Sequence, residues 1–488
     1  MDTVIVQADY TVYSGESFDF TDAEAFGIQQ VQGHAAPSLT IAGAVTETWT
    51  TATGYSRAAI GASGISDSSQ ILVDTTGALK ISALQGGANV YDGGLGSDPD
   101  FVNRGLVQLT SLTIASAGGV HGGDMSFENS GVFRIDGGGM VRGIDISNQA
   151  TVINSGLIDI TAGLYEHGFG IGPYAVSMYA GTFLNSGTIQ ISDPAAGSET
   201  VAVSWYDATD PFSWQPQHSW LNTGTIQGDV ALQVSQPAST QTPELFTNQG
   251  RMIGRIDLGP GGDHLLNSGR IDGEVDLGAG ADTYAGATGV SGAVHGGAGD
   301  DVIIAGLGTN YLRGDDGNDS IVGGSGFNDI NGNLGDDTIE GHSQIGDWLV
   351  GGQGNDLIES HTSGNILYGN IGNDTLVGGA GDEIIRGGQG DDSITAGAGR
   401  AWISGDRGDD TIQGGSGADT FHTFADAGID RVLGFSEAKG DHVEVDPGTV
   451  YAVSQVGADT VINMTGGGQM VLVGVDMANL HPGWIFGA

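Results

Sequence analysis

Residues 296–304 read GGAGDDVII, and this nine-residue unit recurs fourteen times before the array ends at His422. Its general form is Gly-Gly-x-Gly-x-Asp-x-U-x, where U is a large apolar residue, and one extra residue, Gly341, interrupts the period. The eighth position is apolar in every unit: Ile303, Leu312, Ile321, Ile330, Ile339, Leu349, Ile358, Leu367, Leu376, Ile385, Ile394, Ile403, Ile412 and Phe421. This regularity argues against a disordered Gly/Asp-rich linker and predicts a folded array.

The composition of the unit predicts calcium binding. Glycine at three of the first four positions permits a tight turn with positive φ, so that carbonyl oxygens can face one point. The aspartate at position six adds a carboxylate, and such hard oxygen donors suit Ca²⁺ rather than metals that prefer thiolate or imidazole. The last three residues form a short strand with one side chain inward and two outward. A single strand of this size buries very little, so the unit is stable only when it is stacked.

The unit resembles the nonapeptide of the RTX family, whose members are exported by type I secretion systems. The resemblance covers residues 296–422 and implies a calcium β-roll. The end of the chain, residues 423–488 with the ADTF (418–421) that precedes them, resembles the C-terminal segment of that family in the succession ADTF, IDRVLGF, GDHVEV and a final apolar stretch, which implies an uncleaved export signal. An end cap for the roll is the alternative role, and both can hold because an exposed solenoid end needs covering.

Successive units are of two kinds, so two units form one eighteen-residue turn of a flattened roll. One edge, here the strong edge, has aspartate at position six throughout and Asp or Asn at position five; its aspartates are Asp301, Asp319, Asp337, Asp356, Asp374, Asp392 and Asp410. The other, the weak edge, has Asn310, Asn328, Asp347, Asn365, Glu383, Ala401 and Asp419. We expect a filled row of calcium ions along the strong edge. The weak edge should hold weaker or missing ions, with binding least expected beside Ala401.

Strands that follow the weak turns carry large outward side chains: Tyr311, Trp348, Ile366, Tyr368, Ile384 and Trp402. Stacked rungs should place them in one stripe, and exposed apolar stripes usually mark contacts. Two interpretations stay open. The C-terminal segment of the chain covers the stripe, or the stripe is a face for a neighbouring molecule or a glycan.

The charge of the chain fits this reading. The formal net charge is −45 over 488 residues, and residues 296–422 contain 21 acidic residues against four arginines and no lysine. Such self-repulsion disfavours compaction unless cations neutralise it, so folding is expected to await the metal. Extracellular modules bind Ca²⁺ at ~10⁻⁴ to 10⁻³ M, so a chain of this kind can stay unfolded in calcium-poor cytosol and fold outside. Nucleic acid is not an expected partner.

The chain has no cysteine, so neither disulfides nor thiolate metal sites are expected. The first twenty residues, MDTVIVQADYTVYSGESFDF, lack a basic region and a long apolar core, so we expect no Sec signal peptide. No apolar run is long enough to span a membrane. We therefore expect secretion without an N-terminal signal, to the cell surface or the medium.

The upstream half holds a looser repeat, Asn-x-Gly-x-apolar, spaced by 19 to 37 residues, with asparagines at Asn103, Asn129, Asn154, Asn185, Asn222, Asn248 and Asn267. Asn or Gly can occupy a left-handed bend, and a β-prone strand follows each one. Irregular spacing with a fixed corner predicts a parallel β-helix with loops of variable length, and the region resembles the passenger regions of secreted bacterial adhesins. A β-sandwich within the first 100 residues is the alternative.

Asp263 and Asp282 lie in degenerate units and lead to Asp301 in steps of nineteen, so they are further candidate ligands. The predicted fold is all-β, a right-handed parallel β-solenoid that we expect to be continuous. It comprises a β-helix (residues 1–255), a calcium β-roll (256–422, regular from 296) and a C-terminal cap with the export signal (423–488).

Residues 205–220 lie in the longest gap between the asparagine corners and contain Trp205, Tyr206, Trp214 and Trp220. A protruding aromatic loop can stack on sugar rings or anchor a partner. It can equally fold back and pack on its own coil.

The sequence contains no clear catalytic motif. HExxH is absent, and GHSQI at residues 341–345 lacks the second glycine of a lipase elbow. The best candidate for a polysaccharide-active site is the Tyr165–Glu166–His167 region.

These features favour a non-enzymatic, extracellular, calcium-binding structural or adhesive protein. We expect it to associate with itself into a surface layer, fibre or matrix and to use a type I exporter. The alternative is a secreted protein that binds or modifies cell-surface glycans through the aromatic loop.

Overall fold

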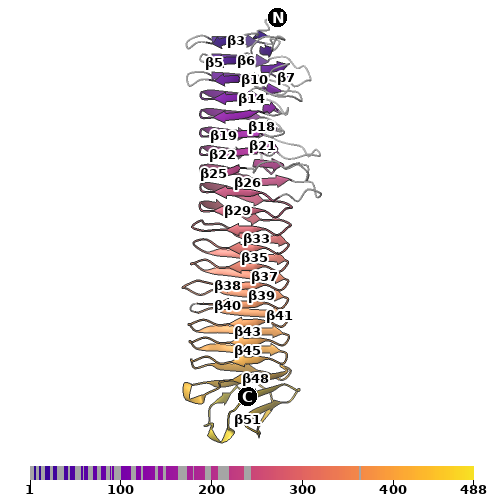
Figure 1. The fold of residues 1–488 in the computed structure, drawn as a ribbon, viewed down its shortest axis with the longest axis vertical. Coiled ribbons are helices and arrows are strands. Elements are labelled where there is room, and N and C mark those ends of the chain that lie inside the picture. The colour runs from indigo at the N-terminus through magenta and orange to yellow at the C-terminus, as the bar shows by residue number, and fades with distance from the viewer. Residues whose placement is uncertain are drawn as a thin grey trace. The chain divides into compact units, whose positions relative to one another are not determined.

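A computed structural model shows an all-β chain (Figure 1). Before residue 100 it describes strands β1–β12 only; after that it describes residues 100–111, 117–122, 125–137, 141–146, 150–162, 173–179, 181–192, 199–206, 219–235, 243–361 and 364–487. The chain divides into two compact units, Met1–Glu274 and Val275–Ala488. Among the described residues, no helix has the length and apolarity needed to cross a membrane.

The first unit is a parallel β-helix whose coils supply strands to three stacks. The first stack is β2(Tyr10–Val12), β5(Ser38–Ile41), β9(Gln70–Val73), β13(Asp100–Asn103), β16(Ser126–Asn129), β19(Ala150–Asn154), β22(Gly181–Asn185), β25(Ser219–Asn222), β27(Leu245–Asn248) and β29(His264–Asn267). The second is β3(Ser17–Thr21), β6(Ala44–Trp49), β10(Ala78–Ala83), β14(Leu106–Ser111), β17(Val132–Gly137), β20(Leu157–Thr161), β23(Thr188–Ser192), β26(Thr225–Ser235), β28(Arg251–Asp257) and β30(Arg270–Asp272). The third is β12(Tyr91–Asp92), β15(Ala117–Gly122), β18(Val141–Ile146), β21(Tyr174–Tyr179) and β24(Val201–Tyr206), which pairs with the second half of β26.

Two smaller parallel groups lie near the N-terminus. They are β1(Ile5–Val6), β4(Phe26–Gln29) and β8(Ile60–Ser63), and the pair β7(Arg57–Ala58) and β11(Ala88–Asn89). All pairings given for the strands before residue 100 are parallel, whereas a β-sandwich is built from antiparallel sheets. The parallel β-helix is therefore confirmed, and the β-sandwich alternative for this region is wrong.

The seven corner asparagines, Asn103, Asn129, Asn154, Asn185, Asn222, Asn248 and Asn267, each end a strand of the first stack and form what we call the asparagine ladder. They are 0–2% exposed. The Nδ2 of each residue donates to the Oδ1 of the next, at 2.7–2.9 Å. The glycine two residues on is required by close approach, since a Cβ on Gly156 would collide with the carbonyl oxygen of Gly131 in the preceding coil.

The second unit is a roll with two parallel stacks. One stack is β32(Thr283–Ala285), β34(Val302–Ile304), β36(Ser320–Val322), β38(Thr338–Gly341), β40(Leu357–Ser360), β42(Thr375–Val377), β44(Ser393–Thr395), β46(Thr411–Gln413) and β48(Ile429–Leu433). The other is β31(Val275–Asp276), β33(Ala293–Ala298), β35(Asn310–Asp316), β37(Asn328–Leu334), β39(Trp348–Gln353), β41(Ile366–Ile371), β43(Glu383–Gln389), β45(Ala401–Arg407), β47(Thr420–Thr423) and β49(His442–Val445).

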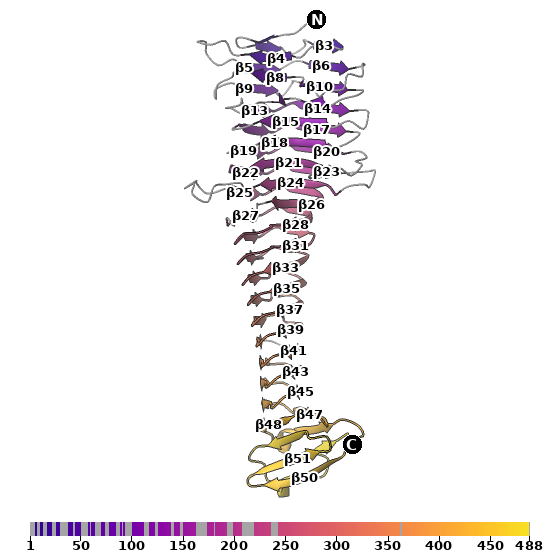
Figure 2. The same cartoon turned by 90° about the vertical axis from the view of Figure 1, so that its right-hand side faces the viewer.

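The two stacks face each other across a thin core. Seen edge-on in Figure 2, strands β33–β45 form a narrow column, whereas Figure 1 shows the broad face of the same strands. All fourteen position-eight side chains are 0–1% exposed and fill the core between the stacks. The flattened roll predicted from the alternation of two kinds of unit is confirmed.

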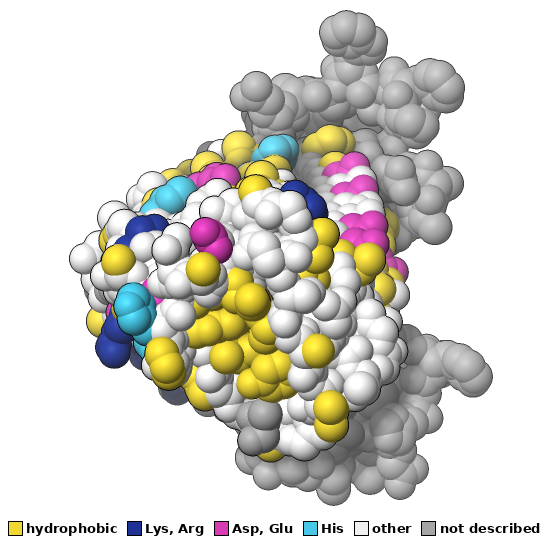
Figure 3. Space-filling model, turned by 90° about the horizontal axis from the view of Figure 1, so that it is seen from below, with side chains coloured by type: hydrophobic (Ala, Val, Ile, Leu, Met, Phe, Trp, Pro, Cys, Tyr) yellow, Lys and Arg dark blue, Asp and Glu magenta, His cyan; other side chains and the backbone are white. Residues whose placement is uncertain are grey.

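The chain after His422 forms an end cap. Strands β50(Tyr451–Val456), β51(Asp459–Met464) and β52(Gln469–Leu472) are antiparallel, and β52 and β53(Ile485–Phe486) continue the two stacks by pairing with β48 and β49. Two short 3₁₀ helices, Glu437–Lys439 and Met477–Asn479, complete it. The ring of Phe435 lies between Phe421 and Trp484, with centroids 5.9 and 6.2 Å apart. Viewed from the C-terminal end, Figure 3 shows a group of hydrophobic side chains on the surface of the cap.

Candidate calcium sites

The strong-edge turns use two residues with positive φ. Position four is always glycine, and Gly354, for example, has a φ of 140°. Position two is glycine in some turns and Asp or Asn in others, as with Asn333 and Asn370 at φ of 78° and 81°. These are the residue types that enter the left-handed region most readily. The sequence pattern therefore builds the tight turn that it predicted.

The seven strong-edge aspartates form a second ladder, here the aspartate ladder (Asp301, Asp319, Asp337, Asp356, Asp374, Asp392 and Asp410). Each is 0–2% exposed. The backbone N–H of each aspartate donates to the Oδ1 of the aspartate one rung later, at 2.8–2.9 Å. One carboxylate oxygen per residue is thus used to join adjacent rungs.

The second carboxylate oxygen has no such partner. The Oδ2 atoms of all seven ladder aspartates are buried without a hydrogen bond, although buried polar groups are normally satisfied. Each Oδ2 lies over the position-one glycine of its own turn. A Cβ on Gly314 would collide with Asp319 Oδ2 and crowd the carbonyl oxygen of Gly332 on the next rung, and the same arrangement recurs at Gly332 and Gly387. A space free of side chains is therefore bounded by a carboxylate oxygen and a carbonyl oxygen from successive rungs.

Burial makes these carboxylates costly to ionise without a cation. Desolvation, followed by repulsion from neighbouring carboxylates, raises the pKa of Asp337 and Asp356 to about 7 and that of Asp392 to about 8. Desolvation likewise raises the pKa of Asp301 to about 7, and that of Asp319 and Asp374 to about 6. A row of buried, mutually repelling oxygens is the donor set that a hard divalent cation stabilises. The orphaned Oδ2 atoms and the glycine-lined spaces fit calcium.

A second, exposed row runs beside this ladder at position five. The backbone N–H of Asn318 donates to Asp300 Oδ1 at 2.8 Å, and the N–H of Asp336 donates to Asn318 Oδ1 at 2.8 Å. The pattern continues through Asn355, Asn373, Asp391 and Asp409. Position five is thus restricted to Asp or Asn because its side-chain oxygen links rungs. The sequence showed this restriction, and the structure gives the reason for it.

The weak edge satisfies more of its own polar groups. Asn310 Nδ2 donates to Asn328 Oδ1 at 2.8 Å, and Asn328 Nδ2 donates to Asp347 Oδ1 at 2.9 Å. The backbone N–H of Asp347 donates to Asn365 Oδ1 at 2.7 Å. The amide side chains of this edge are therefore already hydrogen-bonded, whereas the Oδ2 atoms of the strong edge have no hydrogen-bond donor.

Further along the weak edge the carboxylates return. Glu383 Oε1 accepts from Ser360 and from the Gly379 N–H, while its Oε2 is buried without a hydrogen bond. Asp419 accepts the N–H of Ala401 at 3.0 Å, and burial raises the pKa of both Glu383 and Asp419. Glu383 is therefore the weak-edge residue that most resembles a strong-edge ligand.

The two outlying candidates are also buried, and each takes part in a hydrogen bond between a backbone N–H and a carboxylate oxygen. In the first unit Asp263 is fully buried, and its Oδ1 accepts the N–H of Glu244 at 2.9 Å. In the second unit Asp282 is 1% exposed and donates its N–H to Asp301 Oδ1 at 2.7 Å.

Two ladder residues were missed in the sequence. Asp430 is paired with the Asp410 rung through β46 and β48, and burial with repulsion from Asp410 raises its pKa to about 9. Asp441 continues the weak edge, since its Oδ1 accepts the N–H of Asp419 at 3.0 Å. They stand 20 and 22 residues after their predecessors instead of eighteen, so the fixed period passed over them. Each of the two aspartates stands two residues before a buried valine, Val432 or Val443, just as position six stands two residues before position eight, and this was the available signal.

The outward stripe is largely one register row. Tyr311, Trp348, Ile366, Ile384 and Trp402 occupy equivalent positions on β35, β39, β41, β43 and β45, and Tyr368 lies in the neighbouring row. Tyr311, Trp348 and Ile384 are 47%, 45% and 41% exposed. Trp402 is covered by the C-terminal segment, because its Nε1 donates to Glu444 Oε2 at 2.8 Å. Covering by the chain itself thus applies at the Trp402 end.

The aromatic loop interpretation is wrong for two of its residues. Trp205 lies within β24 and is fully buried, and its ring makes an edge-on contact with the ring of Phe246 at a centroid distance of 6.3 Å. Trp220 lies in β25, is 3% exposed and stacks on Phe183 at 5.2 Å. Both pack in the core of the β-helix, so neither can meet a sugar. Tyr206 is half-buried at the end of β24, and Trp214 lies outside the described residues.

The catalytic candidates give no constellation among the described residues. The Tyr165–Glu166–His167 region lies outside them. The serine of GHSQI, Ser343, is fully buried and takes part in its own turn, where its hydroxyl accepts the N–H of Ile345 at 3.0 Å.

Stacked, glycine-cornered turns with a buried carboxylate ladder define a calcium-binding β-roll. A protein-family model described as RTX calcium-binding nonapeptide repeat (4 copies) matches the same part of the chain, over residues 293–321, 313–346, 322–358, 345–376, 361–394, 377–400 and 395–423. Residues 293–423 are therefore RTX repeats, and their cofactor is calcium, bound as several ions. RTX repeats are typical of extracellular proteins exported by type I systems.

Two other comparisons add little. A crystal structure of the extracellular lipase LipA from Serratia marcescens is similar over 43% of this chain, at 20% sequence identity and a TM-score of 0.22. The matched part spans 40% of that lipase. A search of curated proteins finds no match.

Proposed function

We propose that this protein is an extracellular, calcium-stapled structural or adhesive protein that reaches its location through a type I exporter and associates with copies of itself. The observation that carries the proposal is the row of exposed apolar side chains on a rigid parallel sheet. Tyr311, Trp348 and Ile384 repeat at the same register position and remain 41–47% exposed. The row is interrupted once, by Asp329 between Tyr311 and Trp348, and is otherwise apolar from rung to rung. Such a row suits a partner with the same repeat, which a second copy provides.

The rest of the sequence supports a structural role over a catalytic one. The described strands of both units belong to stacked coils or to the cap, and the described residues include no catalytic constellation of a kind the sequence suggested. Calcium would act here by clamping rungs through the aspartate ladder, so that assembly and fold would depend on the same ions.

The test is electron microscopy and light scattering of the full chain in millimolar calcium. Ordered fibres or sheets that disappear with a Trp348→Ser or Tyr311→Ser variant are expected. Ile304→Ser is the matched control, because Ile304 is 42% exposed but lies on the other stack, in β34. Monodisperse wild-type particles at all protein concentrations would overturn self-association.

Glycan binding is a second candidate function, and we now assign it to a site on the roll instead of the loop at residues 205–220. A shallow hollow of about 940 Å³ is lined by Tyr368, Arg386, Asp406 and neighbours. Arg386 is held in two contacts by Asp406, at 2.8 and 3.0 Å. An aromatic ring beside a fixed polar pair suits a sugar ring, which stacks and hydrogen-bonds at once. A glycan array with wild type and Tyr368→Ala discriminates, since binding that survives the substitution would rule this hollow out.

A further inference from the structure

The one interruption of the repeat brings together three side chains that the calcium sites do not use. Glu340 is in the last part of β38, His342 follows the extra residue Gly341, and His361 follows β40 on the next rung. Strands β38 and β40 pair in register, with Gly341 opposite Ser360, so the two histidines occupy equivalent places on successive rungs. They replace the small residues that usually open a turn of this array.

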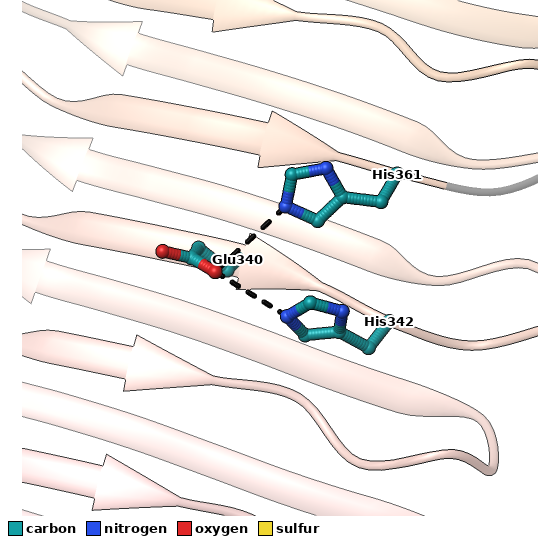
Figure 4. Close-up of side chains that lie close together, drawn as sticks. All are labelled: Glu340, His342 and His361. Atoms are coloured by element: carbon teal, nitrogen blue, oxygen red, sulfur yellow. Dashed lines mark hydrogen bonds and ion pairs between the residues drawn. The ribbon is translucent and has the colours of Figure 1, made fainter.

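The three side chains converge at their tips. Figure 4 shows both imidazole rings directed at the Glu340 carboxylate, and the Nε2 atoms of His342 and His361 lie 3.3 and 3.7 Å from Glu340 Oε2. One ligand atom from each residue lies within 4.8 Å of the others. The ring centroids are 4.9 Å apart and the ring planes are tilted by 34°, so the two rings lie side by side.

These separations match those between ligands around one small metal ion. Zinc holds nitrogen and carboxylate oxygen at ~2.0–2.2 Å in a tetrahedron, which places neighbouring ligand atoms about 3.4 Å apart. Two imidazoles and one carboxylate also differ in kind from the all-oxygen donor set of the aspartate ladder. Imidazole favours zinc and its neighbours nickel and copper, whereas calcium takes oxygen.

We propose that Glu340, His342 and His361 form a binding site for a borderline divalent transition metal, of which zinc is the representative, separate from the calcium ladder. The three side chains are 38–44% exposed. Three protein ligands at an open surface leave the fourth position of the tetrahedron to water or to an incoming group. The metal joins two rungs at the place where the extra residue interrupts the repeat.

Among the described residues, other histidines beside carboxylates provide a contrast. His481 lies 3.1 Å from Glu437, and His295 lies 3.1 Å from Asp315, but among the described residues neither belongs to a group of three ligand atoms within 4.8 Å of one another. His481 is therefore a matched control, an exposed histidine with one carboxylate partner that should not hold zinc.

The experiment is calorimetric titration of the full, calcium-loaded chain with ZnCl₂, in excess calcium so that the ladder is filled. One zinc per chain at micromolar affinity or better is expected. His342→Ala and His361→Ala should each weaken binding by about 100-fold or more, since even outer-shell partners account for about 10–100-fold. His481→Ala should bind as wild type does.

Circular dichroism in calcium establishes that each variant is folded, and a cobalt-substituted sample provides an independent readout through its visible absorption. A wild type that binds zinc no more tightly than the His342→Ala/His361→Ala double variant would overturn the proposal. In that case the cluster is only an ion pair between Glu340 and its histidines.

Discussion

Both units contain a column of buried side chains at successive corners. The column is made of asparagine in the first unit and aspartate in the second, and the two side chains differ by one heavy atom. In the asparagine ladder each amide donates to the next and accepts from the one before, so the column satisfies itself. In the aspartate ladder each carboxylate accepts one backbone N–H and has a second oxygen left over. Because carboxylates are acceptors only, the second column needs a cation to complete it. Exchanging an amide for a carboxylate thus converts a self-sufficient spine into one that depends on metal.

Calcium removal should produce the largest difference in stability between the two units. With excess EDTA, residues 293–423 should lose amide protection, while residues 125–137 and 219–235 of the β-helix should keep theirs. The reason is that the asparagine ladder contains its own donors, whereas the aspartate ladder is left with buried, repelling charges. Hydrogen exchange with mass spectrometry reads both regions in one sample. Equal loss in both regions would break the comparison.

Acid should partly replace calcium in the roll. The pKa values of the ladder aspartates rise on folding from 3.8 to about 6–8, so the metal-free fold binds more protons than the unfolded chain. This contribution is fully present below about pH 4 and is lost as the pH rises through about 6–8. Dialysed, calcium-free protein should therefore show more strand signal by circular dichroism at about pH 5 than at about pH 8. The same signal at both pH values would contradict the assigned burial.

Placing a carboxylate in the asparagine ladder should destabilise the first unit. In an Asn154→Asp variant the donor to Asn185 Oδ1, now at 2.8 Å, becomes an acceptor that faces an acceptor. The expected cost is about 3 kcal/mol, the upper range for a buried unsatisfied group. Urea unfolding followed by hydrogen exchange in residues 150–192 measures it. A loss that calcium restores would show that this column also holds ions.

The reverse exchange should have the smallest effect, with a sign that depends on calcium. Asp356→Asn removes one ligand carboxylate, and loss of the ion that it holds costs about 2.7 kcal/mol when calcium is at about 100 times the dissociation constant. Without calcium the same variant should be more stable than wild type, because a buried carboxylate of raised pKa has gone. Urea midpoints with and without calcium test both signs. Asp391→Asn is the control, with the same charge change at an exposed position-five site.

The sequence predicted the repeating parts well because they obey one geometric rule. A position-eight residue such as Ile330 must point inward wherever the period is eighteen, and an Asn corner such as Asn185 must stack wherever a strand follows it. Both statements need only local spacing and the requirement that coils lie in register. Asp430 and Asp441 escaped because the insertions before them change the spacing while leaving the stacking intact.

Side-chain destinations outside the repeat could not be read from spacing. Trp205 and Trp220 border a long insertion, which made them look like loop residues, but the strands β24 and β25 extend just far enough to bury them. The cluster of Glu340, His342 and His361 depends on which residues face each other across rungs. That information arises from register, and the extra Gly341 hides it in the linear sequence.

The register of the roll has a consequence for molecular length. Thr338, Leu357, Thr375, Ser393 and Thr411 occupy the same place on successive rungs, and each rung pairs only with its immediate neighbours. Gaining or losing one complete eighteen-residue coil would therefore leave the cap and every other contact unaltered. The length of such a molecule can therefore change in evolution by whole coils, and natural variants should differ in length by multiples of eighteen residues.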